Sequence, residues 1–108
     1  MNSVSLVGRL TKDPELRKTM SGDSFVSFTI AVDRIGSKDK ADFINCVAWN
    51  KLADNLAAYK KKGDLIGITG SLNTRTYERD GSTTRITEVH CANIEYISSP
   101  KHEDEVPF

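Results

Sequence analysis

Residues 42–63 have the sequence DFINCVAWNKLADNLAAYKKKG, and the period of the hydrophobic pattern changes inside this segment. Up to Trp49, small apolar residues alternate with larger or polar ones, which is the period-two pattern of a strand. Beyond it, Leu52, Leu56 and Tyr59 recur at the spacing of one helix face. The segment therefore predicts a strand that leads directly into a helix of about three turns.

Polar signals mark both ends of the predicted helix. Asn50 is a favoured N-cap residue because its side-chain oxygen can accept a bond from a free backbone N–H. Gly63 follows three lysines and suits the left-handed position just beyond a helix C-terminus. We therefore expect the helix to run between these two residues.

Strand patterns lie on both sides of this helix. Before it, apolar residues also alternate over Val4–Leu10 and Ser24–Asp33. After it, strand patterning runs over residues 65–78 and 84–97, and Asp80-Gly81 between them is a hairpin-turn sequence. The chain therefore predicts five strands, with the helix between the third and the fourth.

This order of elements is that of the OB-fold, a five-stranded Greek-key barrel that binds oligonucleotides in many proteins. A small α+β sheet would give the same order, because order alone does not establish closure into a barrel. We expect one mainly β domain over residues 1–98. Residues 99–108 are polar, and we expect a short, disordered acidic C-terminal tail there.

Length and composition exclude several classes of protein. The chain of 108 residues suffices for one domain with one core. No apolar run approaches the roughly 20 residues that cross a bilayer, and the first residues do not resemble a signal peptide. We therefore expect a cytoplasmic protein with no membrane contact. Cys46 and Cys91 lie in apolar-patterned segments, and we interpret them as small buried residues with reduced thiols.

The charges are unevenly distributed although the formal net charge is zero. Residues 1–100 contain 14 Lys or Arg and 12 Asp or Glu, a net charge of +2. Residues 101–108 carry a net charge of −2. A mildly basic body with an acidic appendage is compatible with a surface that binds nucleic acid.

Aromatic side chains lie on the faces of two predicted strands that do not carry the small core residues. By alternation, Phe43 and Trp49 share the outer face of one strand, and Tyr77 lies between Arg75 and Arg79 on the other. Strand aromatics are often core or cross-strand partners. Stacking, however, binds any base through its π-face, and arginines bind phosphates. The combination favours a surface for single-stranded nucleic acid.

Other residues are less informative. Arg34, Lys38 and Lys40 flank a polar loop that could close over a bound strand, and a solvated loop is the alternative. The two histidines, His90 and His102, are not part of a catalytic arrangement, and the cysteines do not have metal-ligand spacing. We expect neither enzymatic activity nor a metal or other cofactor.

Several longer segments resemble the bacterial-type single-stranded DNA-binding proteins, including phage-encoded members and short paralogues. The similarity covers nearly all of residues 1–97. The matching segments are residues 7–17 (VGRLTKDPELR), 27–32 (SFTIAV), 42–53 (DFINCVAWNKLA), 70–77 (GSLNTRTY) and 87–89 (TEV). Together these matches are specific, because they are long and occur in the same order.

The resemblance implies an OB-fold that assembles as a homotetramer, around which single-stranded DNA wraps. It places Phe43, Trp49 and Tyr77 at positions whose aromatics stack on bases. A further stacking position falls near Arg34, so that stacking there would have to use a guanidinium plane. The first strand, around residues 3–10, resembles the strand that forms dimers in this family.

The last residues resemble the family's terminal motif of acids, an aliphatic residue, proline and phenylalanine. Apolar side chains and the α-carboxylate of such a tip can enter a partner's pocket while the acids meet basic residues. An acidic solubilising tail would need no terminal aromatic residue. The expected partner-binding residues are Glu103, Asp104, Glu105, Val106, Pro107 and Phe108.

We expect a protein that coats and protects single-stranded DNA without reading its sequence, in replication, recombination or repair, and that recruits partner proteins through its tip. One alternative is an interaction module that binds DNA weakly and acts through its partners. A second alternative is an RNA-binding OB protein, because stacking does not distinguish the two sugars.

Overall fold

The computed structural model describes residues 1–37 and 39–98. Its elements are, in chain order, β1 (Val4–Leu10), β2 (Arg17–Lys18), β3 (Ser24–Asp33), β4 (Ala41–Trp49), α1 (Asn50–Tyr59), β5 (Leu65–Arg79) and β6 (Ser82–Ser98). The five predicted strands and the helix between the third and fourth of them are therefore present. The two-residue β2 is additional, and it is too short to show any alternation.

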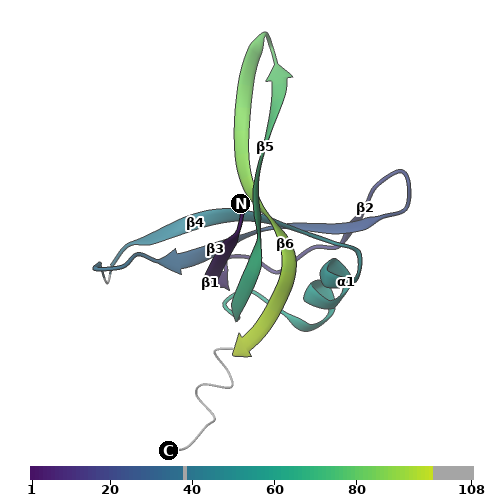
Figure 1. Ribbon diagram of the computed structural model, residues 1–108. Helices are drawn as coiled ribbons and strands as arrows, with labels where there is room; N and C mark the ends of the chain where they lie inside the picture. The colour runs from purple at the N-terminus through teal and green to yellow at the C-terminus, as the bar shows by residue number, and fades with distance from the viewer. Residues whose placement is uncertain (38, 99–108) are drawn as a thin grey trace, which may run out of the picture.

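The five long strands close into a ring (Figure 1). β1 pairs with β5, β5 with β6, β4 with β3 and β3 with β1, all antiparallel, whereas β4 and β6 pair in parallel. The β1–β3 and β4–β6 junctions each contain only two residue pairs. The predicted OB-fold barrel is confirmed, and the open α+β sheet is excluded. β2 adds to the free edge of β3 outside the ring.

Closure requires a glycine where β1, still paired with β5, also comes up against β3. A Cβ atom on Gly8 would lie 2.7 Å from the carbonyl oxygen of Ala31, closer than side chains approach a backbone. The two strands therefore come together at this point only because position 8 has no side chain.

The core follows the predicted alternation except on β4, where Val47, between the inward-facing Cys46 and Ala48, is also buried. Inward-facing residues of β3, β4, β5 and β6 meet in one cluster, and α1 covers an end of the barrel with Ala53 and Leu56, both fully buried. The largest fully buried side chains are Ile30, Leu56, Ile66, Ile68, Val26, Val89 and Cys46. Cys46 is a free, buried thiol, as expected, and Cys91 is free and half-buried.

Both predicted ends of the helix are wrong in detail. Trp49 occupies the N-cap position without a side-chain bond, while the Asn50 side chain accepts the N–H of Ser24 at 3.3 Å. The helix ends at Tyr59, before the three lysines. The Asp64 carboxylate accepts the N–H of residue 61 at 2.8 Å, and this local bond replaces a further helical turn.

Beyond the barrel, β5 and β6 continue as a two-stranded hairpin that projects away from the other elements (Figure 1). Its turn is Asp80-Gly81, where both residues have positive φ angles of 53° and 79°, as a type I′ turn requires. By alternation along β5, Leu72 shares a face with the buried Ile66 and Ile68, but it is 46% exposed because it lies where the hairpin leaves the barrel.

A register shift near the root of the hairpin changes which residues of β6 face the core. Asn93 pairs with Thr69 but Cys91 pairs with Gly70, so Ala92 has no partner. Across this bulge the inward positions of β6 change from odd numbers, Val89 and Cys91, to even numbers, beginning with Ile94. A Cβ atom on Gly70 would lie 2.0 Å from the carbonyl oxygen of His90, so the bulge also depends on a glycine.

Candidate nucleic-acid interface

The predicted aromatic residues lie on the outside of the barrel. On β4, Phe43 is 68% exposed and Trp49 is 39% exposed, whereas Cys46 and Ala48 are buried. Phe43 and Trp49 are six residues apart in the sequence, which corresponds to about 20 Å of strand. Phe43 and Trp49 therefore offer two separated aromatic surfaces on the face that does not form the core.

Trp49 is positioned by an aromatic neighbour on the adjacent strand. Phe25 of β3 pairs with it in the register, and the two ring centroids are 5.3 Å apart with the ring planes tilted by 34°. A tilted pair at this distance is a favourable aromatic contact. The cross-strand role and the exposed surface coexist, so the indole is held in place and still accessible.

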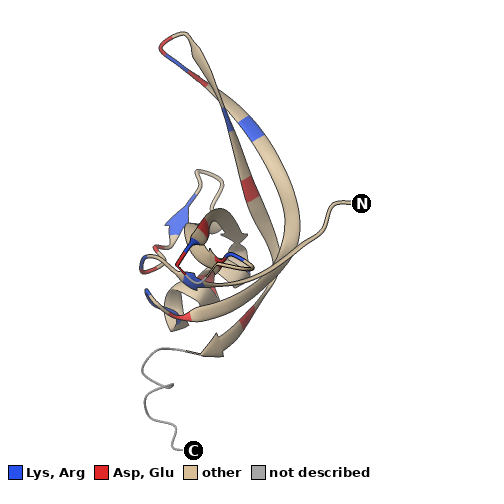
Figure 2. Cartoon of the chain, turned by 90° about the vertical axis from the view of Figure 1, so that its left-hand side faces the viewer, with Lys and Arg blue, Asp and Glu red and all other residues tan. Residues whose placement is uncertain are grey.

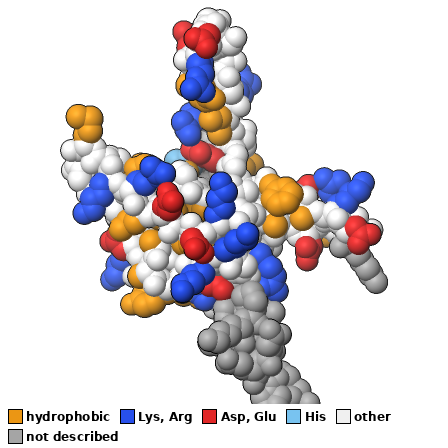
Figure 3. Space-filling view, turned by 180° about the vertical axis from the view of Figure 1, so that it is seen from behind, with side chains coloured by type: hydrophobic (Ala, Val, Ile, Leu, Met, Phe, Trp, Pro, Cys, Tyr) orange, Lys and Arg blue, Asp and Glu red, His pale blue; other side chains and the backbone are white. Residues whose placement is uncertain are grey.

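The hairpin carries the third aromatic between two cations. Arg75, Tyr77 and Arg79 alternate along β5 and therefore share one face of the hairpin. Tyr77 is 40% exposed. Figure 3 shows hydrophobic and basic side chains interleaved along the hairpin. The predicted grouping of these three residues on one exposed face fits this arrangement.

A groove of about 580 Å³ connects the barrel to the root of the hairpin. Its floor includes the outer faces of β3 and β4, where Thr29 Oγ1 donates a hydrogen bond of 3.2 Å to Asn45 Oδ1. The segment that follows β1 forms one side and the hairpin another. The lining residues are Thr11, Lys12, Asp13, Glu15, Arg17, Ser27, Phe28, Thr29, Asn45, Cys46, Arg75, Ile86 and Glu88.

A buried carboxylate lies at the root of the hairpin and was not predicted. Glu88 is only 8% exposed, and its Oε1 atom accepts a hydrogen bond of 3.2 Å from Arg75 Nε. The same oxygen lies 3.1 Å from Nε2 of His90. Arg75 pairs with Ile86 in the register of the hairpin, and Glu88 and His90 follow Ile86 by alternation along β6. The turn sequence and the alternation together would therefore have indicated that these three side chains share one face.

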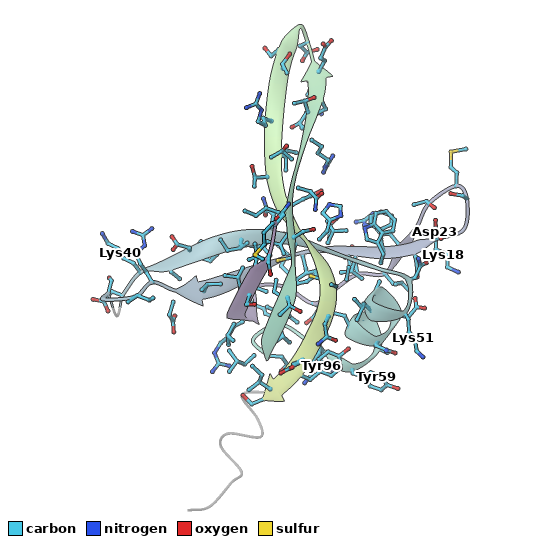
Figure 4. The ribbon with its side chains drawn as sticks, viewed as in Figure 1. Lys18, Asp23, Lys40, Lys51, Tyr59 and Tyr96 are labelled. Atoms are coloured by element: carbon cyan, nitrogen blue, oxygen red, sulfur yellow. The ribbon has the colours of Figure 1, made fainter. Side chains whose placement is uncertain are left out.

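The cations of the β3–β4 loop differ in their surroundings. Arg34 Nη2 donates a hydrogen bond to Asp42 Oδ1, and this bond holds the pKa of Asp42 below its ordinary value. Lys40 is exposed in the same loop, just before β4 begins (Figure 4). Lys38 lies outside the described residues. Of the three predicted loop cations, Arg34 therefore already has an acidic partner.

Charge is mixed over the whole described surface. Figure 2 shows Lys and Arg on the hairpin and around the barrel, with Asp and Glu among them. Within residues 1–37 and 39–98, no group of three or more His, Cys, Asp or Glu is arranged to hold a metal ion. In the same residues, no helix is long and apolar enough to cross a membrane. The predicted partner-binding residues 103–108 lie outside the described part of the chain.

A family model now connects this geometry to known proteins. The model of the single-strand binding protein family matches residues 1–97. The chain belongs to the single-strand binding protein family. The resemblance inferred from the sequence segments is thereby confirmed, and the matched range ends one residue before the last described strand does.

Relatives of this family member are closely similar over the same region. It is 49% identical over 102 residues to the single-stranded DNA-binding protein of Bacillus cereus, covering 90% of this chain and 60% of the relative. It is 46% identical over 107 residues to single-stranded DNA-binding protein A of Bacillus subtilis, covering 94% and 62%. The chain thus spans about three-fifths of the length of these curated relatives.

A solved structure shares the fold. The crystal structure of a deletion mutant of the single-stranded DNA binding protein from Thermus aquaticus matches with a TM-score of 0.74 and 29% identity. The match covers 90% of this chain and 41% of the other. The barrel and its topology are therefore those of the single-strand binding protein family.

Proposed function

We propose that this chain is a non-catalytic protein that binds single-stranded DNA without reading its sequence, and coats and protects it in replication, recombination or repair. The observation that carries the proposal is the exposed face with Phe43, Trp49 and Tyr77 beside Arg75 and Arg79. The similarity to relatives that are single-stranded DNA-binding proteins supports DNA as the ligand.

In this proposal each group has a distinct task. Bases stack on the three aromatic rings, and each stacked base contributes about 1–3 kcal/mol. Arg75 and Arg79 on the hairpin, and Lys38 and Lys40 in the β3–β4 loop, bind phosphates and make binding dependent on salt. Arg34 offers its guanidinium plane to a base while Asp42 holds it.

The single tryptophan of the chain allows a direct test. Because Trp49 is half-exposed on the proposed face, oligo(dT) should quench its fluorescence as a base stacks on it. The logarithm of the affinity should fall linearly with the logarithm of the salt concentration, by about 0.7 for each phosphate contact. An oligonucleotide that binds without changing the fluorescence would remove Trp49 from the interface.

The same titration with matched RNA and duplex DNA tests the choice of ligand. Stacking on unpaired bases requires that duplex DNA binds much more weakly than oligo(dT). Equal affinity for the matched RNA would favour the RNA-binding alternative, since the 2′-hydroxyl is what separates the two ligands. Tighter binding of the duplex than of the single strand would refute the proposal.

We propose further that the protein is a homotetramer and that β1 takes part in an interface between copies. An apolar surface on the outside of β1, β5 and β6 supports this assembly. A Cβ atom on Gly67 would lie 3.6 Å from Ile97 Cδ1 and 3.8 Å from Val7 Cγ2, and both side chains are about half exposed. Native mass spectrometry should give the mass of four chains. Val7→Asp should lower the fraction of the protein that is present as this tetramer. A monomer for the unaltered protein would contradict the assembly.

Partner recruitment through the C-terminal residues is a separate proposal, and the sequence EDEVPF at 103–108 supports it. Its acids suit a basic surface, and Val106 and Phe108 suit an apolar pocket. Deleting residues 106–108 should abolish binding to a partner protein of DNA metabolism while affinity for oligo(dT) stays the same. A scrambled order of the same six residues is the matched control, and recruitment by the scrambled tail would contradict the proposal.

A further inference from the structure

One carboxylate oxygen at the root of the hairpin is shared by two basic side chains. Glu88 Oε1 is 3.2 Å from Arg75 Nε and 3.1 Å from His90 Nε2. Glu88 is buried, whereas 60% of the Arg75 side chain and 36% of the His90 side chain are exposed. The carboxylate is therefore a fixed anchor, and the two basic groups around it are accessible from solvent.

The net charge of Arg75, Glu88 and His90 together depends on pH. Arginine is always protonated, whereas a histidine changes its charge between about pH 5 and pH 8. While His90 is neutral, Glu88 offsets the charge of Arg75. When His90 gains a proton, the group as a whole carries one net positive charge, and Arg75 shares its partner with a second cation.

The surroundings include few other groups that change charge in this range. Cys46 of β4 faces Glu88, and hydrogen bonding to Cys91 together with burial raises the pKa of its thiol, so it stays neutral. Cys91 follows His90 along β6, and its hydrogen bond with Cys46 lowers the pKa of the Cys91 thiol. Ser71 of β5 lies opposite His90 and carries no charge. The remaining charged groups that line the groove with Glu88 are Lys12, Asp13, Glu15 and Arg17.

This cluster lies within the proposed path of the nucleic acid. Arg75 and Glu88 both line the groove, and Arg75 shares its face of the hairpin with Tyr77. His90 lies beside a second hollow of about 410 Å³, next to Asn2 and Ser3. A phosphate bound to Arg75 would therefore sense the net charge of the cluster.

We propose that Glu88 and His90 are positioning residues for Arg75, and that a proton on His90 strengthens the binding of single-stranded nucleic acid. The inference rests on the proposed function of this face. Glu88 orients the guanidinium, and the proton on His90 decides how much of its charge is available to a phosphate. By linkage, nucleic acid bound at Arg75 favours the protonated form of His90 to the same extent.

The test measures oligo(dT) affinity by fluorescence anisotropy at pH 5.5 and pH 7.5 and fixed ionic strength. Thymine takes up no proton in this range, so the ligand is constant. We expect about two- to fivefold tighter binding at pH 5.5, the size of one exposed charge interaction. The salt dependence should also steepen by up to about 0.7. His90→Gln should lose this pH dependence, and Glu88→Gln should weaken it.

Controls separate the possible outcomes. His102→Gln removes the only other histidine and should keep the full pH dependence. If His90→Gln keeps it as well, or if the unaltered protein shows none, the inference is wrong although DNA binding stands. Absence of oligo(dT) binding at both pH values would instead refute the proposed function. Should His90→Gln fail to fold, an NMR titration of the unaltered protein decides, because oligo(dT) must raise the titration midpoint of His90.

Discussion

Replacing Trp49 with alanine changes two properties of the protein that can be measured separately. The indole contacts Phe25 on the neighbouring strand, with ring centroids 5.3 Å apart, and it is also 39% exposed on the proposed DNA face. The contact with Phe25 stabilises the barrel, and the exposed part of the indole is available to a base. The substitution therefore lowers both the free energy of unfolding and the affinity for DNA.

The two magnitudes follow from the geometry. Loss of one stacked base costs about 1–3 kcal/mol, which is about a 5- to 150-fold increase in Kd. Removing a large aromatic from a core costs about 3–5 kcal/mol. Trp49 is only partly buried, so the decrease in the free energy of unfolding should be smaller than this. It should be at least the energy of the aromatic pair with Phe25, about 0.5–1.5 kcal/mol.

Anisotropy of a labelled oligo(dT) measures the affinity, since the variant has no tryptophan, and urea denaturation followed by circular dichroism measures the stability. Phe25→Leu is the matched control, because it removes the aromatic pair but leaves the indole. It should lose stability while keeping most of the affinity. If folded Trp49→Ala binds oligo(dT) as tightly as the unaltered protein, the assignment of Trp49 to the interface is refuted.

Three further perturbations have defined outcomes. Tyr77→Ala should weaken oligo(dT) binding by about 1–3 kcal/mol, measured by anisotropy, with little change in stability, because the hairpin projects from the core. Gly70→Ala should lower the free energy of unfolding by about 1–3 kcal/mol or more in urea denaturation, because its Cβ would overlap the backbone of β6. The Asp42 carboxyl should titrate below its ordinary range in an NMR titration, because Arg34 bonds to it. The small stabilisation from this pair is present above the ordinary pKa of Asp and is lost as the pH falls through the lowered pKa.

Each of these perturbations has a matched control or a result that would contradict it. Tyr96 is also 40% exposed but lies beside α1, away from the hairpin (Figure 4), so Tyr96→Ala should not weaken DNA binding. Gly67→Ala meets neighbours only at 3.6 Å or more and should be tolerated, so equal destabilisation by both glycine variants would refute the clash. An unaltered titration of Asp42 in Arg34→Gln would show that the pair does not cause the shift.

Local patterns predicted the local elements well. Alternation placed the five strands, and Asp80-Gly81 predicted a turn in which both residues do have positive φ angles. The switch to helical spacing after Trp49 predicted the position of α1. These features depend on neighbouring residues in the sequence, so a single sequence contains the information for them.

Features that depend on distant residues could not be predicted in the same way. The parallel junction of β4 and β6 joins residues 46–47 to residues 89–90 and has no local signal. The helix ends early, and the backbone N–H groups of residues 62 and 63 bond instead to the Asp13 carboxylate and the Leu10 carbonyl, both distant in the sequence. The bulge at Ala92 changes the inward positions of β6, and it forms where Gly70 lets the backbone of His90 come close, which is a contact between distant residues.

The projecting hairpin has a consequence for the length of DNA that one copy covers. Residues 73–79 extend beyond the barrel, which adds about 20 Å of strand to the proposed binding face. Side chains alternate between the two faces, so removing one residue from each strand between the barrel and Arg75 would turn Arg75 and Tyr77 to the opposite side. Removing two would keep them in place. A change in length between the barrel and Arg75 therefore keeps both side chains on the binding face only in steps of two residue pairs, each of about 7 Å.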